Sequence, residues 1–261
     1  MTIVITPLIG LMSDQIKNIT SMTDVAVTIN SEYTPDEKQK IKEQLQNGQK
    51  SILYISPETL LSNNPITSLI GDRKIGLLVV DEAHIVSTWG KSFRPDYWYL
   101  GDYISKLRQN GGYSFPISTF SATITYGGSD DMHNDIIDSL KMKTGIFEYI
   151  APMRRDDISF DIHTITKEND YTKEKESTVL RALFDLRKGD NKTLVYFPFV
   201  KHINDYYNKI RDEGHSFIGK YYGSLDKQLK KDAMKDFVTA KQGMMLATKA
   251  FGMGIDIDDI N

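Results

Sequence analysis

The chain has 261 residues, of which 40% are hydrophobic and 26% are charged, and its formal net charge is −3. These values are typical of a soluble globular protein with one large or two ordinary domains. Any binding of nucleic acid must therefore come from the local placement of donors and aromatic side chains and not from bulk charge attraction. The absence of cysteine excludes disulfides and thiolate zinc sites. No apolar run approaches the roughly 20 residues that cross a bilayer, and the first residues lack a basic secretory leader. We therefore expect a cytoplasmic protein without membrane contact and without zinc.

In the first half of the chain, short apolar runs alternate with segments of helical periodicity. The runs predict strands at residues 2–6, 25–29, 51–55, 75–80 and 115–120. The intervening segments predict helices at 8–19, 65–72, 97–109 and 131–142, and one more helix that Pro35 opens and Gly48 ends.

A second series follows the charged, proline-containing stretch 151–157, which suits a linker. It predicts strands at 158–165, 192–197, 216–223 and 243–248, with helices at 174–188, 199–213 and 226–239. Strands with continuous apolar runs indicate parallel sheets that are covered on both faces. The sequence thus predicts an α/β fold with two domains, 1–150 and 151–261, each with a parallel sheet flanked by helices.

The most specific chemical signal is an acid pair, Asp81 and Glu82, directly after the apolar run 75–80. In an open parallel sheet, ligands gather at the carboxyl ends of the strands. There Asp81 can hold Mg²⁺ and Glu82 can polarise an attacking water. Such a pair can also simply cap the next helix, but the tetrad "DEAH" on a buried strand favours catalysis.

Hydroxyl side chains end another predicted strand in "STFSAT" (118–123). Ser121 and Thr123 could bridge the acid pair to the neighbouring domain, and we assign Thr123 to the nucleotide-binding set. His84 is predicted to relay between the acids and this segment. The alternative for "STFSAT" is a plain Ser/Thr turn.

Two further strand ends carry features of phosphate binding. Thr6 and Pro7 precede a helix whose N-terminal N–H groups are ready anion donors, and Ser56 repeats the pattern in "YISPE". Each alone is an ordinary strand-to-helix turn. Two of them on one sheet edge predict a track for a nucleic-acid backbone.

The loop 85–97 holds Trp89, Phe93 and Arg94, spaced by glycine and proline. Aromatic faces and a guanidinium plane are surfaces on which unpaired bases stack, at about 1–3 kcal/mol per base. We prefer this reading to a local core that holds the loop.

The second half offers weaker signals. Gly252 and Gly254 allow a ligand to approach the backbone, and Asp256 could accept a hydrogen bond from a sugar hydroxyl. Lys201 is a candidate phosphate contact. A simple turn explains the glycines equally well.

Taken in order, "VITPLIGLMSDQ", "ILYISPE", "VVDEAH", "IVSTWGKSFRPDY", "SAT", "LVYF" and "ATKAFGMGID" resemble the successive motifs of RecQ-type superfamily 2 DNA helicases. The resemblance covers nearly the whole chain, and the Trp-Gly…Phe-Arg-Pro loop is close to specific for this group.

The resemblance implies two RecA-like domains that couple ATP hydrolysis to 3′-to-5′ translocation and unwinding, with single-stranded and duplex DNA as partners. Asp81 would hold Mg²⁺ and Glu82 would activate water. The aromatic loop would sense single-stranded DNA, on which Thr6, Pro7 and Ser56 would also lie. Gly254 and Asp256 would approach the nucleotide from the second domain.

The chain also departs from the family pattern. It contains no G-x-x-x-x-G-K-[ST] loop, and the final arginine-finger motif is missing. We expect an incomplete core, truncated in both domains, that binds ATP poorly by itself. The alternatives are a non-catalytic nucleic-acid-binding remnant, or a DEAH-type motor acting on RNA or in a restriction or defence complex.

Overall fold

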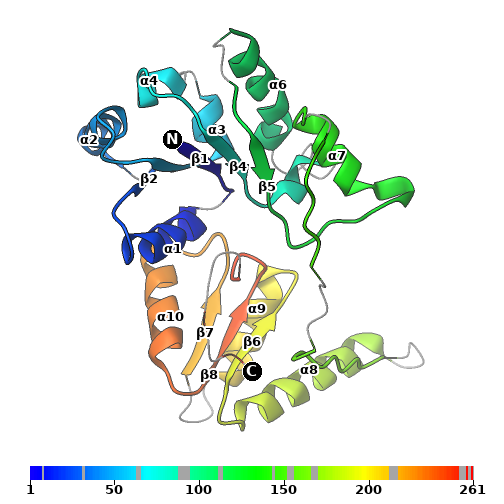
Figure 1. Cartoon of the computed structure of the whole chain (residues 1–261). Coiled ribbons are helices and arrows are strands. Elements are labelled where there is room, and N and C mark those ends of the chain that lie inside the picture. Colours follow the sequence, from blue (N-terminus) through cyan, green and yellow to red (C-terminus); the bar gives the residue numbers. More distant parts are fainter. Residues whose placement is uncertain are drawn as a thin grey trace. The chain divides into compact units, whose positions relative to one another are not determined.

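A computed structural model of the chain describes residues 1–7, 9–30, 33–62, 66–87, 95–110, 114–142, 145–151, 156–165, 170–211, 217–252, 257 and 260. The chain divides into two compact units, Met1–Arg154 and Arg155–Asn261 (Figure 1). Each unit is an α/β layer structure with a parallel sheet, which confirms the predicted fold class.

The sheet of the first unit has five parallel strands in the order β2-β3-β1-β4-β5. Their bounds are Thr2–Ile5 (β1), Ala26–Ile29 (β2), Ile52–Ile55 (β3), Leu77–Val80 (β4) and Ile117–Thr119 (β5). The central strands are almost fully buried, as continuous apolar runs require when helices cover both faces.

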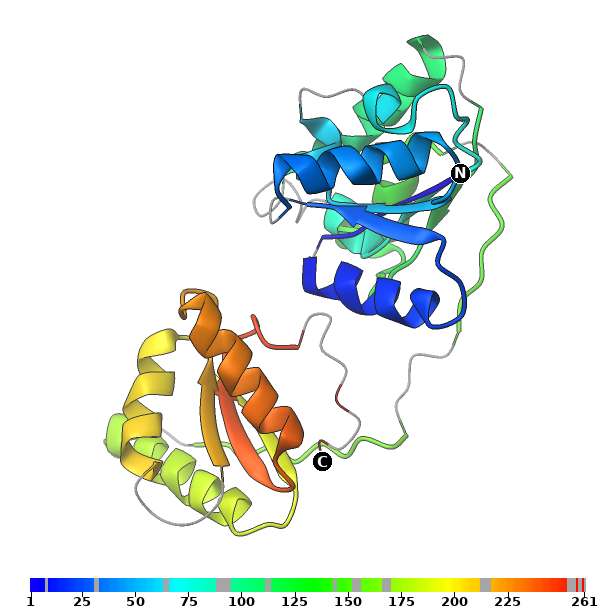
Figure 2. The same cartoon turned by 90° about the vertical axis from the view of Figure 1, so that its left-hand side faces the viewer.

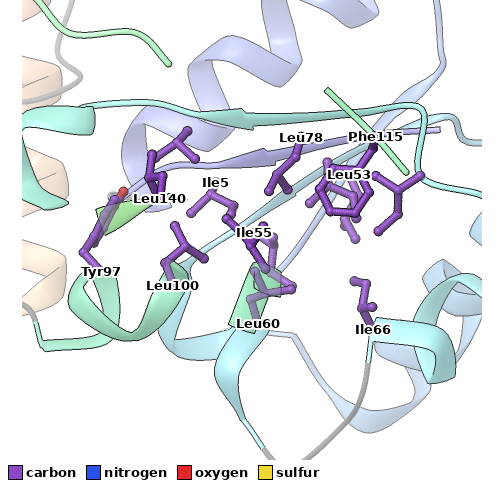
Figure 3. Packing of buried hydrophobic residues seen from close by; sticks show 14 of the residues in the cluster. Ile5, Leu53, Ile55, Leu60, Ile66, Leu78, Tyr97, Leu100, Phe115 and Leu140 are labelled. Carbon is purple, nitrogen blue, oxygen red and sulfur yellow. The ribbon is translucent and has the colours of Figure 1, made fainter. Parts of the chain in front are cut away.

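Helices cover the two faces of this sheet unequally. The larger hydrophobic cluster, on one face, receives residues from α2 (Pro35–Gln46), α3 (Pro57–Leu61), α4 (Ile66–Ile70), α6 (Pro95–Asn110) and α7 (Met132–Ser139). Figure 3 shows part of it, with Leu60 of α3, Ile66 of α4 and Leu100 of α6. The other face packs against α1 (Ile9–Thr20) through Met12, Ile16 and Ile19. Figure 2 shows α1 and α2, in two shades of blue, on opposite sides of the sheet.

Local sequence explains where α2 begins and ends. The Thr34 side chain accepts the N–H of Glu37, the Glu37 carboxylate accepts the N–H of Thr34, and Pro35 occupies the first helical position. Gly48, with φ +86°, turns the chain after the helix. Two short 3₁₀ turns, η1 (Ala83–Val86) and η2 (Gly128–Asp130), complete this unit.

The sheet of the second unit has three parallel strands in the order β6-β8-β7. They are β6 (Lys192–Tyr196), β7 (Phe217–Tyr221) and β8 (Gly243–Ala247). Residues of α8 (Tyr171–Arg187) and α9 (Val200–Ile210) pack on one face, and α10 (Lys227–Thr239) packs on the other.

The strand predicted at 158–165 is wrong. This stretch is irregular, and its alternating apolar side chains are exposed, with Phe160 at 86% and Ile162 at 84%. A strand needs a neighbour for its backbone hydrogen bonds, and among the described residues 158–165 pairs with none. The other predicted strands and helices are present, and α3 was not predicted.

Within the ranges given above, no helix is both long and apolar enough to cross a bilayer.

Candidate functional site

The carboxyl edge of the first sheet brings three predicted site residues together. Ile5 of β1 is in register with Ile55 of β3 and Val80 of β4. Thr6, Ser56 and Asp81, one residue further on, therefore lie along the same edge. Backbone hydrogen bonds extend past the strands, from Thr6 N–H to the Ile55 carbonyl (3.2 Å) and from Asp81 N–H to the Ile5 carbonyl (2.8 Å).

Asp81 is held by contacts on both carboxylate oxygens. Oδ1 accepts the backbone N–H of Glu82 at 2.9 Å, and Oδ2 accepts Gln15 Nε2 at 3.5 Å, the long end of a hydrogen bond. The Tyr97 hydroxyl donates to the Asp81 carbonyl at 3.4 Å. The carboxylate is thus oriented by its own chain turn and by α1.

The charge of Asp81 also affects Tyr54, a buried residue of β3. Burial, and next the negative charge of Asp81, raise the pKa of the Tyr54 phenol above its ordinary value. Tyr54 belongs to the hydrophobic cluster under α1. The Asp81 charge therefore acts on the face of the sheet that α1 covers.

Glu82 has an unusual backbone conformation, with φ 49° and ψ 45° in the left-handed region. For a residue other than glycine this conformation is uncommon and costs free energy, and such residues are enriched at active sites. The Glu82 carboxylate lies 3.3 Å from Nδ1 of His84, and the same nitrogen lies 2.9 Å from the Ser121 hydroxyl. His84 thus lies between the acid pair and the Ser121–Thr123 segment.

Thr123 is exposed, and its backbone N–H donates to the Ser121 hydroxyl at 3.3 Å. The carbonyl of Phe120 accepts the N–H of Ala83 at 2.9 Å, which ties the two strand ends together. The Ser/Thr turn considered from the sequence is therefore present, next to His84.

The residues predicted along the DNA track differ in exposure. Thr6 is completely buried, and in the described part of the chain its Oγ1 has no hydrogen-bond partner. Pro7 is buried as well. Ser56 is partly exposed and caps α3, with its Oγ accepting the Thr59 N–H at 3.2 Å. From Thr6 and Pro7, a surface contact would have to use the backbone.

The chemistry of this edge fits Mg²⁺. Among the described residues no group of three or more His, Cys, Asp or Glu side chains is placed to hold a metal ion. Mg²⁺, however, is usually bound by one or two carboxylates, with water and phosphate oxygens completing its shell. Asp81 supplies one carboxylate, and two buried oxygens without a described partner, Thr6 Oγ1 and Gln15 Oε1, accompany it.

In the second unit, Gly252 follows β8 in a tight turn. Its φ is +120°, and a Cβ at this position would lie 2.4 Å from the Tyr196 hydroxyl. That hydroxyl donates to the carbonyl of Phe251 at 2.8 Å, and burial raises the pKa of Tyr196. The turn therefore requires glycine for both conformation and space. Lys201 is exposed in the first turn of α9.

Five predicted site residues lie outside the described residues: Trp89, Phe93, Arg94, Gly254 and Asp256.

Sequence reasoning missed Gln15, Tyr54 and Tyr196. For Gln15 a signal was present, because it falls among Met12, Ile16 and Ile19 at helical spacing and is thus a polar residue on the buried face of α1. Tyr54 and Tyr196 read as ordinary strand residues, and only the three-dimensional contacts distinguish them.

Two family models match the chain: the DEAD/DEAH box helicase model over residues 1–131 and the helicase conserved C-terminal domain over 174–261. The chain is 28% identical to the ATP-dependent DNA helicase RecQ of Haemophilus influenzae, covering 100% of this chain and 39% of the relative. It is also 28% identical to the probable ATP-dependent DNA helicase RecS of Bacillus subtilis, covering 100% and 49%. The chain thus spans about two fifths of the length of the first relative and about half of the length of the second.

Solved structures share the fold. Dbp5 of S. cerevisiae bound to RNA and ADP BeF3 matches with a TM-score of 0.66 and 19% identity, over 100% of this chain and 60% of that chain. The Mycobacterium smegmatis helicase Lhr bound to ssDNA and AMP-PNP matches with a TM-score of 0.65 and 14% identity, over 99% and 35%. The two parallel-sheet units are RecA-like helicase domains similar in sequence to those of RecQ helicases, and the chain belongs to the DEAD/DEAH box helicase family.

Proposed function

We propose that the chain forms the two RecA-like domains of an ATP-dependent DNA helicase that translocates 3′ to 5′ on a single strand and unwinds duplex DNA. The observation that supports this most is the shared edge of the first sheet, where an acid pair lies beside Thr6 and Ser56. One edge thus presents a metal-binding carboxylate next to candidate phosphate contacts. The relatives named RecQ act, by their names, on DNA with ATP.

In this proposal the acid pair divides its roles. Asp81 holds Mg²⁺, which when bound neutralises charge on the nucleotide phosphates. Glu82 orients and deprotonates the attacking water, and His84 links Glu82 to Ser121 through the contacts at 3.3 Å and 2.9 Å. Thr123, Gly252, Gly254 and Asp256 complete the nucleotide-binding set. Gly252 contributes through its close backbone approach.

The DNA contacts come from two groups of residues. The DNA phosphates contact three sets of groups: the backbone N–H groups after Thr6 and Pro7, the region of Ser56, and Lys201. The aromatic loop with Trp89, Phe93 and Arg94 stacks on unpaired bases. We place this activity in the cytoplasm, in keeping with the composition.

The test measures ATP hydrolysis with and without single-stranded DNA, using the product of the whole reading frame. We expect DNA to stimulate hydrolysis in the wild type. Glu82→Gln should lower kcat by at least about 10²-fold, because a positioned general base contributes about that much, and should leave nucleotide affinity nearly unchanged. Glu43→Gln, at an exposed carboxylate near the C-terminal end of α2, is the control and should keep full activity.

The other functions have their own outcomes. DNA binding without any stimulated hydrolysis would support the non-catalytic remnant. Stimulation by RNA rather than DNA would support a motor acting on RNA. Hydrolysis that survives Glu82→Gln would contradict the role assigned to this carboxylate.

A further inference from the structure

Gln15 is a polar residue on the buried face of α1. Met12 is completely buried, and Ile16 and Ile19 pack with it against the sheet. Gln15 lies three residues after Met12 and four before Ile19, so the helix directs all three to the same side. The amide of Gln15 is thereby held against the sheet next to the acid pair.

The two ends of this amide have different surroundings. Nε2 donates to Asp81 Oδ2 at 3.5 Å, whereas Oε1 is buried and has no hydrogen-bond partner among the described residues. The reverse orientation would point an amide oxygen at a carboxylate oxygen, which is repulsive. The charge of Asp81 therefore fixes which way the amide faces.

Thr6 adds a second buried oxygen in the same place. Along β1 and β4, Val4 and Val79 face α1, whereas Ile5 and Val80 face the larger cluster. Side chains alternate along a strand, so the next residues, Thr6 and Asp81, return to the α1 side. The strands keep them neighbours, through the hydrogen bond from Asp81 N–H to the Ile5 carbonyl.

Leaving two buried oxygens without a partner costs free energy, and most buried polar groups are paired. One belongs to the amide that contacts the Asp81 carboxylate, and the other to Thr6, which the register of β1 and β4 places beside Asp81. Neutral oxygens around one acid suit a hydrated divalent cation better than a further protein group.

We propose that Gln15 is a positioning residue for Asp81: its amide N–H fixes the carboxylate, and its carbonyl oxygen, with the Thr6 hydroxyl, faces the water shell of the cation. The proposal rests on the proposed function, since it takes Asp81 as the cation ligand. It also joins that ligand to α1, the helix whose first turn is proposed to receive a DNA phosphate.

The first experiment measures melting temperature in a double-mutant cycle of Gln15→Ala and Asp81→Ala. We expect Gln15→Ala to lower the melting temperature, and to lower it by less than half as much when Asp81 is already Ala. Asn18→Ala, which removes an exposed amide from the same helix, should act equally in both backgrounds. Equal losses from Gln15→Ala in both backgrounds would overturn the proposal.

The second experiment uses Gln15→Glu with Mg²⁺ or Mn²⁺ alone. A second carboxylate facing Asp81 at this distance repels it, so the melting temperature should fall below that of Gln15→Ala. Added cation should then recover it by several degrees more than in the wild type. Asn18→Asp, and Gln15→Glu combined with Asp81→Ala, should show no such recovery.

A Gln15→Glu protein that does not recover at any cation concentration would overturn the proposal. Neither experiment needs nucleotide or DNA. An inactive helicase with intact coupling between positions 15 and 81 would therefore count against the proposed function alone.

Discussion

The two units share one architecture but present different chemistry at the carboxyl edges of their sheets. In the first unit the edge carries the carboxylate of Asp81, the amide of Gln15 and the buried hydroxyl of Thr6. In the second unit the chain after β8 carries a glycine turn braced by the Tyr196 hydroxyl. The first edge thus presents a charged side chain, and the second presents backbone groups. A parallel sheet therefore determines where a ligand binds but not which protein groups bind it.

The hydrophobic cores of the two units also differ. The first unit has one large, mainly aliphatic cluster and a small one under α1, whereas both clusters of the second unit are small. In one of these, Phe237 and Phe251 pack edge to face with their ring centroids 5.9 Å apart. The second unit therefore depends more on single aromatic side chains.

The largest expected effect tests that dependence. Phe237 is completely buried, so Phe237→Ala should lower the free energy of unfolding of the second unit by about 3–5 kcal/mol in urea titrations. Phe199→Ala, at a side chain 63% exposed in the same unit, is the control. Similar losses from both changes would show that the aromatic cluster does not carry this unit.

A smaller effect is expected at the glycine turn. Gly252→Ala should destabilise the second unit by about 1–3 kcal/mol, because φ is strained and the new methyl group meets the Tyr196 hydroxyl. Tyr196→Phe removes that hydroxyl, so the loss from Gly252→Ala should be smaller in the Phe variant. An unchanged loss would mean that backbone strain alone requires the glycine.

The first unit should respond in the opposite direction at Thr6. Thr6→Val removes a buried hydroxyl without a described partner, and should raise the free energy of unfolding by about 1 kcal/mol. Thr28→Val is the matched control, since the buried Thr28 hydroxyl donates to Met12 Sδ at 3.4 Å. Stabilisation by both changes, or by neither, would remove the distinction between a site hydroxyl and a structural one.

The smallest expected effect is on the stability of the protein at acidic pH. The backbone and side chain of Thr34 lower the pKa of Glu37 below 4.5. When the pKa of a carboxyl group is lower in the folded than in the unfolded state, ionisation of the group stabilises the folded state. This stabilisation is fully present above the unfolded-state pKa and is lost as the pH falls through the folded-state pKa. Glu37→Gln should therefore flatten the stability profile below about pH 4.5, as melting temperatures against pH would show. An unaltered profile of melting temperature against pH would mean that the exposed capping box does not contribute to stability.

Much of this organisation could be predicted from sequence, because buried parallel strands are continuous apolar runs and strand ends such as Asp81 and Ser56 share one edge. The irregular stretch 158–165 could not be predicted, since its alternation is that of a strand, and no strand among the described residues pairs with it. The contact of Gln15 with Asp81 joins residues that are far apart in the chain, so the length and direction of this hydrogen bond cannot be predicted from the sequence.

The exposed stretch 158–165 also has a practical consequence. Ile158, Phe160 and Ile162 are exposed apolar side chains at alternating positions of a segment whose backbone groups pair with no described strand. Such a segment can add to its counterpart in another molecule, and purified samples should therefore self-associate as concentration rises. Phe160→Lys should keep the protein dispersed, which makes it a useful variant for crystallisation and storage.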